Sequence, residues 1–321
     1  LRFRTRGKRR HHSRQAPKTR AVGVEKQIVD ALPFKPTRAQ MEAYKDVATD
    51  MGRPMPMRRM IQGDVGSGKT VVALLAMARA VEVFRENGQK VAQMTEAEAA
   101  QARRINAEAP AVLAREAAAC GAWLVHYSTD YVFDGSGTAP WMESDAAAPL
   151  NVYGQTKREG EQAIVQSGCR HLVFRTSWVY AARGANFAKT MLRLARERDA
   201  LNVIDDQTGA PTGADLLADV TAHALRVAQA RPDVAGIYHL APQGEVTWWG
   251  YASFVIAQAR AMGETLQVQS IAAIPSSAYP VAARRPLNSR LSTQKLQATF
   301  GLHLPQWQDG VQRMLAETLG K

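Results

Sequence analysis

Tyr153 and Lys157 are four residues apart, so on a helix their side chains lie on the same face. A phenol beside a substrate carbonyl can donate a proton as hydride arrives, and a nearby ammonium favours the phenolate, which lowers the pKa of the tyrosine. The lysine could also hold the ribose of a nicotinamide cofactor. Such a pair also occurs by chance at the surface of many proteins. The pair alone therefore leaves carbonyl reduction and a surface pair as alternatives.

A hydroxyl upstream of this pair favours the catalytic alternative. The apolar run WLVHY is expected to form a strand that leads into Thr129. Ligands of open α/β sheets bind at the carboxyl ends of the strands, so Thr129 can hydrogen-bond the same carbonyl oxygen as Tyr153. We therefore predict that Thr129, Tyr153 and Lys157 form one catalytic site. His126 in the same run is interpreted as a packed side chain and not as a ligand.

A second pattern, GDVGSGKT at residues 63–70, fits G-x-x-x-x-G-K-[ST] between a predicted strand and a predicted helix. Its glycines let backbone N–H groups turn toward a phosphate, the lysine would neutralise the outer phosphates of ATP, and the threonine would hold Mg²⁺. The alternative is a glycine-rich turn that binds nothing. The candidate ATP ligands are Gly63, Gly66, Gly68, Lys69 and Thr70. No Asp-Glu pair follows an apolar strand downstream, so ATP hydrolysis is not expected.

The elements that must position these residues alternate regularly along the chain. Strands are expected in AWLVHYST, HLVFRTSW, LNVI and GIYHLAP, and helices are expected to begin near Tyr153, Asn186, Ala214 and Thr247, with another at Pro110. Alternating strands and helices predict an α/β fold with a parallel sheet covered by helices. A strand-helix unit around the glycine loop should precede this sheet, and a smaller substrate lobe should follow it, built mainly from the last 120 residues.

Residues 98–321 resemble the dTDP-4-dehydrorhamnose reductases, a family of extended short-chain dehydrogenases. The resemblance is carried, in the family's order, by INAEAPAVLAREAA, STDYVFDG, APLNVYGQTKREGE, RTSWVY, NFAKTMLRLA, DDQTGAPT and RRPLNSRL. It implies that Thr129, Tyr153 and Lys157 are catalytic, with Tyr153 and Lys157 also binding the cofactor. It further implies that Tyr131 and Trp178 contact the deoxysugar, although both could otherwise be core aromatics.

The same resemblance implies a reaction and its partners. The family reduces the 4-keto group of dTDP-4-dehydro-6-deoxy-L-mannose with NADPH, which gives dTDP-L-rhamnose and NADP. A homodimer in which Mg²⁺ takes part is also implied.

Residues 25–94 instead resemble the start of the helicase core of RecG-type ATP-dependent DNA helicases. The resemblance is carried by LPFKPTRAQ, PMRRMIQGDVGSGKTVVALLAMARAVE and GQKVAQM. It implies that Lys69 and Thr70 serve ATP. The helicase family's Asp-Glu box, second motor domain and DNA-binding wedge have no counterpart in the chain. We therefore expect a hybrid of a basic disordered tail (1–21), a P-loop helicase-like part (22–97) and a reductase-like part (98–321).

The glycine-rich cofactor loop of the reductase family is missing from its expected place. The family resemblance puts G-x-x-G-x-x-G near residue 30, where only Gly23 is close. The Rossmann-like part is thus expected to lack its first dinucleotide-binding half, which weakens NADPH binding and leaves little turnover. An ATP- and DNA-binding helicase fragment and a non-functional fusion product are the alternative functions.

The net charge of +12 is concentrated at the start of the chain. Residues 1–20 hold nine Lys and Arg and no acid, which predicts a solvated arm, with weak nucleic-acid contact as the alternative. No apolar run of about eighteen residues and no cleavable leader is present, so neither membrane spanning nor secretion is expected. The two cysteines, Cys120 and Cys169, fit a reducing cytoplasm.

Overall fold

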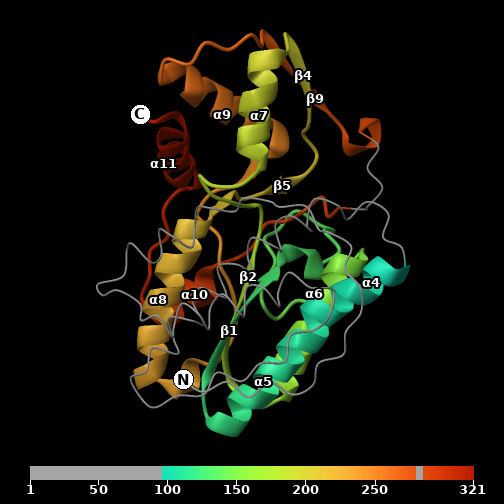
Figure 1. The fold of residues 1–321 in the computed structure, drawn as a ribbon, viewed down its shortest axis with the longest axis vertical. Coiled ribbons are helices and arrows are strands. Elements are labelled where there is room, and N and C mark those ends of the chain that lie inside the picture. Colours follow the sequence, from blue (N-terminus) through green and yellow to red (C-terminus); the bar gives the residue numbers. More distant parts are fainter. Residues whose placement is uncertain (1–95, 280–284) are drawn as a thin grey trace, which may run out of the picture. The chain divides into compact units, whose positions relative to one another are not determined.

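The computed structural model describes residues 96–279 and 285–321 (Figure 1). These residues belong to one compact unit of the chain, Val91–Lys321. The basic tail, the glycine loop at residues 63–70 and the helicase-like segment at residues 25–94 lie outside the described residues. Within the described ranges, no helix is both long enough and apolar enough to cross a membrane.

Three parallel strands form the main sheet, in the order β1-β2-β7. They are β1 (Trp123–Thr129), β2 (Arg170–Thr176) and β7 (Gly236–His239). The register of the sheet places Thr129 opposite Thr176, and Arg175 opposite His239. The strands predicted in AWLVHYST, HLVFRTSW and GIYHLAP are confirmed, and so is the parallel sheet of the α/β fold.

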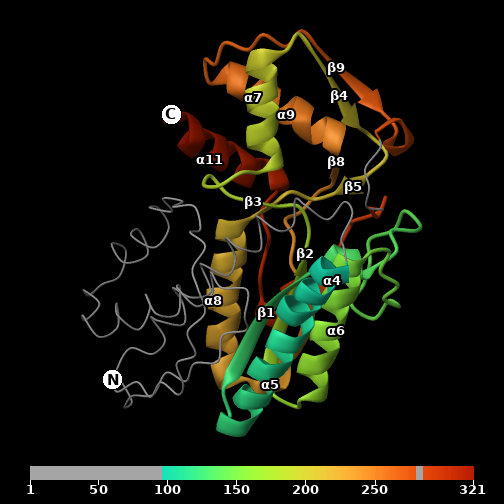
Figure 2. The ribbon, with the colours of Figure 1, turned by 45° about the vertical axis from the view of Figure 1, so that its right-hand side comes forward.

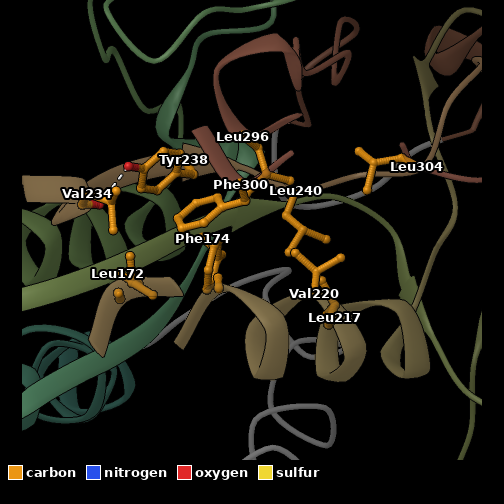
Figure 3. Close-up of a cluster of buried hydrophobic side chains, with 12 residues drawn as sticks. Leu172, Phe174, Leu217, Val220, Val234, Tyr238, Leu240, Leu296, Phe300 and Leu304 are labelled. Atoms are coloured by element: carbon orange, nitrogen blue, oxygen red, sulfur yellow. Dashed lines mark hydrogen bonds between the residues drawn. The ribbon is translucent and has the colours of Figure 1, made fainter. Parts of the chain in front are cut away.

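Helices cover both faces of this sheet, as Figure 2 shows. On one face lie α5 (Ala109–Cys120) and α6 (Val152–Gln166), and on the other lie α8 (Ala214–Ala230) and α10 (Gln294–Phe300). The core against α8 and α10 is the larger one, because aromatic and branched side chains from β2 and β7 fill it (Figure 3). Its buried members are Leu172, Phe174, Leu217, Val220, Ala224, Ala228, Val234, Tyr238, Leu240, Leu296, Phe300 and Leu304.

The helix before β1 is longer than predicted. α5 includes Pro110 near its start, as expected, but it continues a helical run that begins with α4 (Glu96–Arg103) and passes through a π-helical segment, η1 (Arg104–Glu108). Pro110 lies in the first turn of α5, directly after the π segment, where its missing N–H is tolerated. The π segment contains the buried Asn106, whose Nδ2 donates to Thr156 Oγ1 at 3.1 Å.

A second lobe packs α7 (Phe187–Glu197), α9 (Trp248–Ala261) and α11 (Trp307–Leu319) with the parallel pair β4 (Ala200–Ile204) and β9 (Ser270–Ile274). The strand predicted in LNVI is therefore confirmed as β4. The short elements are η2 (Asp130–Val132), β3 (Val179–Tyr180), β5 (Thr208–Gly209), β6 (Thr212–Gly213), η3 (Pro232–Val234), β8 (Val246–Thr247) and η4 (Ser276–Ala278). The lobe is not simply the last part of the chain, because α8, β7 and α10 return to the main sheet between its elements.

Side-chain caps explain why three of the four predicted helix starts fall where they do. Asn151 accepts the N–H of Gly154 at the start of α6, Asn186 does the same for Lys189 in α7, and Thr247 for Gly250 in α9. Such caps satisfy N–H groups that have no partner within the helix. The predicted starts near Tyr153, Asn186, Ala214 and Thr247 are confirmed within one residue.

A buried ion pair fixes α6 on the sheet. Glu161 of α6 accepts two hydrogen bonds from the Arg175 guanidinium of β2, at 2.9 and 2.8 Å, and the two side chains are 0% and 2% exposed. Arg158, which is 31% exposed, donates to the same carboxylate at 3.0 Å. Burial by itself raises the pKa of Glu161, but the hydrogen bonds and charge of Arg175 outweigh it and lower the pKa overall.

Replacing Arg175 with methionine should lower the free energy of unfolding by roughly 3–5 kcal/mol, because it leaves a carboxylate buried without its main partner. The matched control is Arg158→Met, which removes a partly exposed guanidinium from the same carboxylate and should cost less than about 1 kcal/mol. Urea unfolding at neutral pH measures both variants. Equal losses in the two would contradict the role given to the buried pair.

Candidate active site

Thr129 and Tyr153 meet at the carboxyl edge of the main sheet. Thr129 is the last residue of β1 and Tyr153 lies in the first turn of α6, and the two are close enough that Thr129 acts on the pKa of Tyr153. The Thr129 hydroxyl also lies 3.0 Å from Asp130 Oδ1 and accepts the backbone N–H of Tyr131 at 3.2 Å. The predicted proximity of the threonine and the tyrosine is therefore present in the structure.

The turn that carries Tyr131 packs closely on α6 because residue 154 is glycine. A Cβ at this position would lie 2.1 Å from the carbonyl oxygen of Tyr131, far inside contact distance. The close approach brings the Tyr131 ring edge-on to the Tyr153 ring, with 5.8 Å between the ring centroids. Tyr131 is thus part of the same cluster as Tyr153. Burial, together with the charge of Asp130, raises the pKa of Tyr131 to about 12.

Lys157 lies one turn further along α6 and is buried. Its Nζ donates to the backbone oxygen of Tyr127 at 2.5 Å and lies 3.1 Å from His126 Nε2. Burial lowers the pKa of Lys157 to about 8, and the charge of Glu161 opposes this shift. Burial and then the Lys157 charge lower the pKa of His126 well below its usual value, so its ring is neutral and can accept from the ammonium. His126 therefore does more than pack, which the sequence interpretation did not foresee.

The predicted lowering of the Tyr153 pKa by Lys157 is wrong. Burial raises this pKa above its usual value; the hydrogen bond with Thr129 opposes the shift, and Asp130 and Tyr131 add to it. The Lys157 ammonium is engaged instead by a backbone carbonyl of β1. Tyr153 is protonated at neutral pH, as a tyrosine with its ordinary pKa of 10.0 also is, and in that form it can donate a proton.

Asp130 is a buried carboxyl at this edge that sequence reasoning did not single out as functional. Burial raises its pKa to about 6, although hydrogen bonds with Ser289 and Thr129 favour the charged form. The available signal was its position between Thr129 and Tyr131, directly after a strand. Ser289 lies in RRPLNSRL, one of the segments that carry the family resemblance, but its proximity to Asp130 depends on packing between segments far apart in the chain.

Trp178 lies at the same edge but in another environment. It follows Thr176, the register partner of Thr129, by two residues. Its indole stacks on that of Trp248 in α9, with 3.6 Å between ring centroids and 13° between ring planes. Thr129, Tyr131 and Tyr153 thus lie together, whereas Lys157 contacts His126 and Tyr127 one turn further along α6. Trp178, two residues after the end of β2, packs on the second lobe.

The edge also offers polar groups to a ligand. Thr176 Oγ1 is buried and has no hydrogen-bond partner among the residues that the structure describes. Open parallel sheets bind nucleotides at this edge, so an unpartnered hydroxyl beside Thr129 suits a polar ligand there. In the described part of the chain, no cluster of three or more His, Cys, Asp or Glu side chains could hold a metal ion.

Known proteins match this chain over most of its length. A family model described as the RmlD substrate binding domain matches residues 47–319. The dTDP-4-dehydrorhamnose reductase of Escherichia coli (strain K12) is 52% identical over 255 residues, which cover 79% of this chain and 85% of that protein. The reductase of the same name from Burkholderia thailandensis is 42% identical over 267 residues, or 81% of this chain and 89% of that one.

A solved structure supports the same assignment. The crystal structure of dTDP-4-dehydrorhamnose reductase from Bacillus anthracis in complex with NADP has a TM-score of 0.63 and 30% identity, and the match covers 75% of this chain and 85% of that one. The fold described above is thus shared with a reductase that binds NADP. The chain belongs to the dTDP-4-dehydrorhamnose reductase family.

The resemblance of residues 25–94 to a helicase has no support from these matches. The family match begins at residue 47, so it includes the glycine loop with Gly63, Lys69 and Thr70. ATP, Mg²⁺ and nucleic acid are likewise unsupported as ligands, and a homodimer is not shown. That the Rossmann-like part lacks its first half is not confirmed either. The tail, the glycine loop and the helicase-like segment all fall within residues 1–95, which are outside the described residues.

The stability of the folded chain should depend on pH through Lys157. Its pKa of about 8 in the fold lies below the ordinary 10.5, so between these pH values the unfolded chain binds the extra proton. Stability from this group therefore rises with pH in that window. The free energy of unfolding of the wild type, measured against Lys157→Met, should increase between pH 8 and 10.5. If the difference in free energy of unfolding between the wild type and Lys157→Met does not change with pH, the amine at this position is not buried.

Proposed function

We propose that the chain reduces the 4-keto group of dTDP-4-dehydro-6-deoxy-L-mannose to give dTDP-L-rhamnose. The observation that carries this proposal is the position of Thr129 beside Tyr153 at the carboxyl edge, with the buried Lys157 one turn away. The identity of 52% to a relative named for this reaction supports the choice of substrate. NADPH, when bound, supplies the hydride.

Each residue of the cluster has a distinct role in this proposal. Tyr153 carries its proton at neutral pH, so it can donate that proton to the carbonyl oxygen as C4 accepts hydride. Thr129, beside Tyr153, orients the same oxygen. Lys157 holds the ribose of the cofactor, and its contacts with β1 fix its position. Tyr153 and Thr129 can thus deliver one proton to one oxygen atom, while Lys157 holds the cofactor.

Tyr131 and Trp178 are the proposed contacts of the deoxysugar. The Tyr131 ring is held against Tyr153 by the close approach of its turn to α6, so it borders the reacting oxygen. Trp178 comes from the neighbouring strand at the same edge. Aromatic faces suit the C–H groups of a 6-deoxy sugar, because these groups are apolar.

The efficiency of the reaction is a separate part of the proposal. No G-x-x-G-x-x-G pattern occurs near residue 30, and such a loop normally binds the pyrophosphate of a dinucleotide at a helix N-terminus. We therefore expect weak NADPH binding and low turnover. We also propose that the chain is divided into a tail (1–21), a P-loop part (22–97) and a catalytic part (98–321).

Substituting Tyr153 with phenylalanine should lower the single-turnover rate by a factor of about 10²–10⁴, because it removes the proton donor. The control is Tyr127→Phe, which removes a hydroxyl that bonds Thr221 Oγ1 at 2.7 Å on the opposite face of the sheet. Both variants are assayed at excess NADPH, and chromatography monitors the conversion of the keto sugar to dTDP-L-rhamnose. A Tyr153→Phe rate equal to that of the control would overturn the assigned role.

A further inference from the structure

Trp178 has a backbone conformation that bulky residues rarely adopt. Its φ of 46° is positive, and among the described residues it is the one non-glycine residue for which this holds. Such a conformation is strained for a side chain with a Cβ, and it persists only where the surroundings fix it. The question is therefore which groups hold Trp178.

One side of the Trp178 ring is held by Trp248. The two indoles are stacked, and Trp248 is itself fixed, because its Nε1 donates to Gln207 Oε1 at 3.1 Å. Gln207 is buried and donates through Nε2 to Ser276 Oγ at 2.9 Å. The ring of Phe187 packs on Trp248 with 4.5 Å between the centroids. Trp248 is thus a rigid support anchored in the second lobe.

Gly209 restricts the edge of the Trp178 ring. A Cβ at position 209 would lie 2.9 Å from Cε2 of Trp178, so any other residue would displace the indole. The carbonyl oxygen of Trp178 accepts the N–H of Thr212 at 3.2 Å, which ties its backbone to the same loop. The ring therefore has contacts on a face and on an edge, and its peptide is fixed as well.

We propose that Trp248 and Gly209 are positioning residues, which hold Trp178 in its strained conformation as a preformed platform for the apolar face of a deoxysugar. This inference rests on the function proposed above, in which Trp178 contacts the sugar. A platform that is already ordered binds without the entropy cost of immobilising an aromatic side chain. The selectivity for the sugar then depends on α9 and on the loop at Gly209 as well as on the catalytic edge.

The stacking can be tested without activity. Two indoles in close contact couple their electronic transitions, so the far-ultraviolet circular dichroism spectrum should contain an exciton couplet. Trp248→Phe and Trp178→Phe should each abolish it. Trp249→Phe is the matched control, because Trp249 is the next residue of α9 and donates to the backbone of Ile271. A couplet that survives in Trp248→Phe would overturn the inference.

The positioning role can be tested by calorimetric titration of the same variants with dTDP-L-rhamnose and with dTDP alone. Trp248→Ala should weaken the binding of dTDP-L-rhamnose about fivefold to tenfold and leave dTDP unchanged, whereas Trp248→Phe recovers part of the loss. Gly209→Ala should behave like Trp248→Ala, and Trp249→Ala like the wild type. Equal losses for both ligands would show a merely structural role and overturn the inference.

Failure of the proposed function would look different. A wild-type chain that binds dTDP-L-rhamnose no more tightly than dTDP would refute the sugar-binding role, and with it the platform, even if the exciton couplet is present. A wild type that prefers dTDP-L-rhamnose, together with an unchanged preference in Trp248→Ala, refutes only the inference about Trp248.

Discussion

The ion pair of Glu161 and Arg175 is the interaction on which the rest of the site depends. It lies between α6 and β2 and is almost completely buried, so it determines how α6 sits on the sheet. The same helix carries Tyr153 and Lys157, and Glu161 follows Lys157 by one turn. Its carboxylate also counteracts the effect of burial on the Lys157 amine. One buried contact thus holds the helix that carries Tyr153 and Lys157, and it partly offsets the effect of burial on the lysine.

Burial, and not attraction between the two side chains, dominates the electrostatics of Tyr153 and Lys157. It raises the pKa of the phenol and lowers that of the amine, so each group is pushed toward its neutral form. The amine is kept in place by the carbonyl of Tyr127 and the ring of His126. The phenol carries its proton at neutral pH, which is the form that can protonate a carbonyl oxygen.

The sequence predicted much of the described fold, because its strands and helices depend on local signals. Strand periodicity and caps such as Asn186 and Thr247 are readable from neighbouring residues, and the spacing of Tyr153 and Lys157 requires only a helix. The contact of His126 with Lys157, the direction of the Tyr153 pKa shift and the stack of Trp178 on Trp248 depend on packing between distant segments. Residues 1–95, with the glycine loop, lie outside this comparison.

The most direct test of the account is a single turnover with excess protein, dTDP-4-dehydro-6-deoxy-L-mannose and NADPH that carries deuterium in the transferred position. With the protein in excess, weak cofactor binding slows the reaction without hiding its product. The account predicts dTDP-L-rhamnose with deuterium at C4 of the sugar, measured by mass spectrometry and NMR. Recovery of unchanged keto sugar, under conditions where the intact Escherichia coli relative converts it, would contradict the central claim.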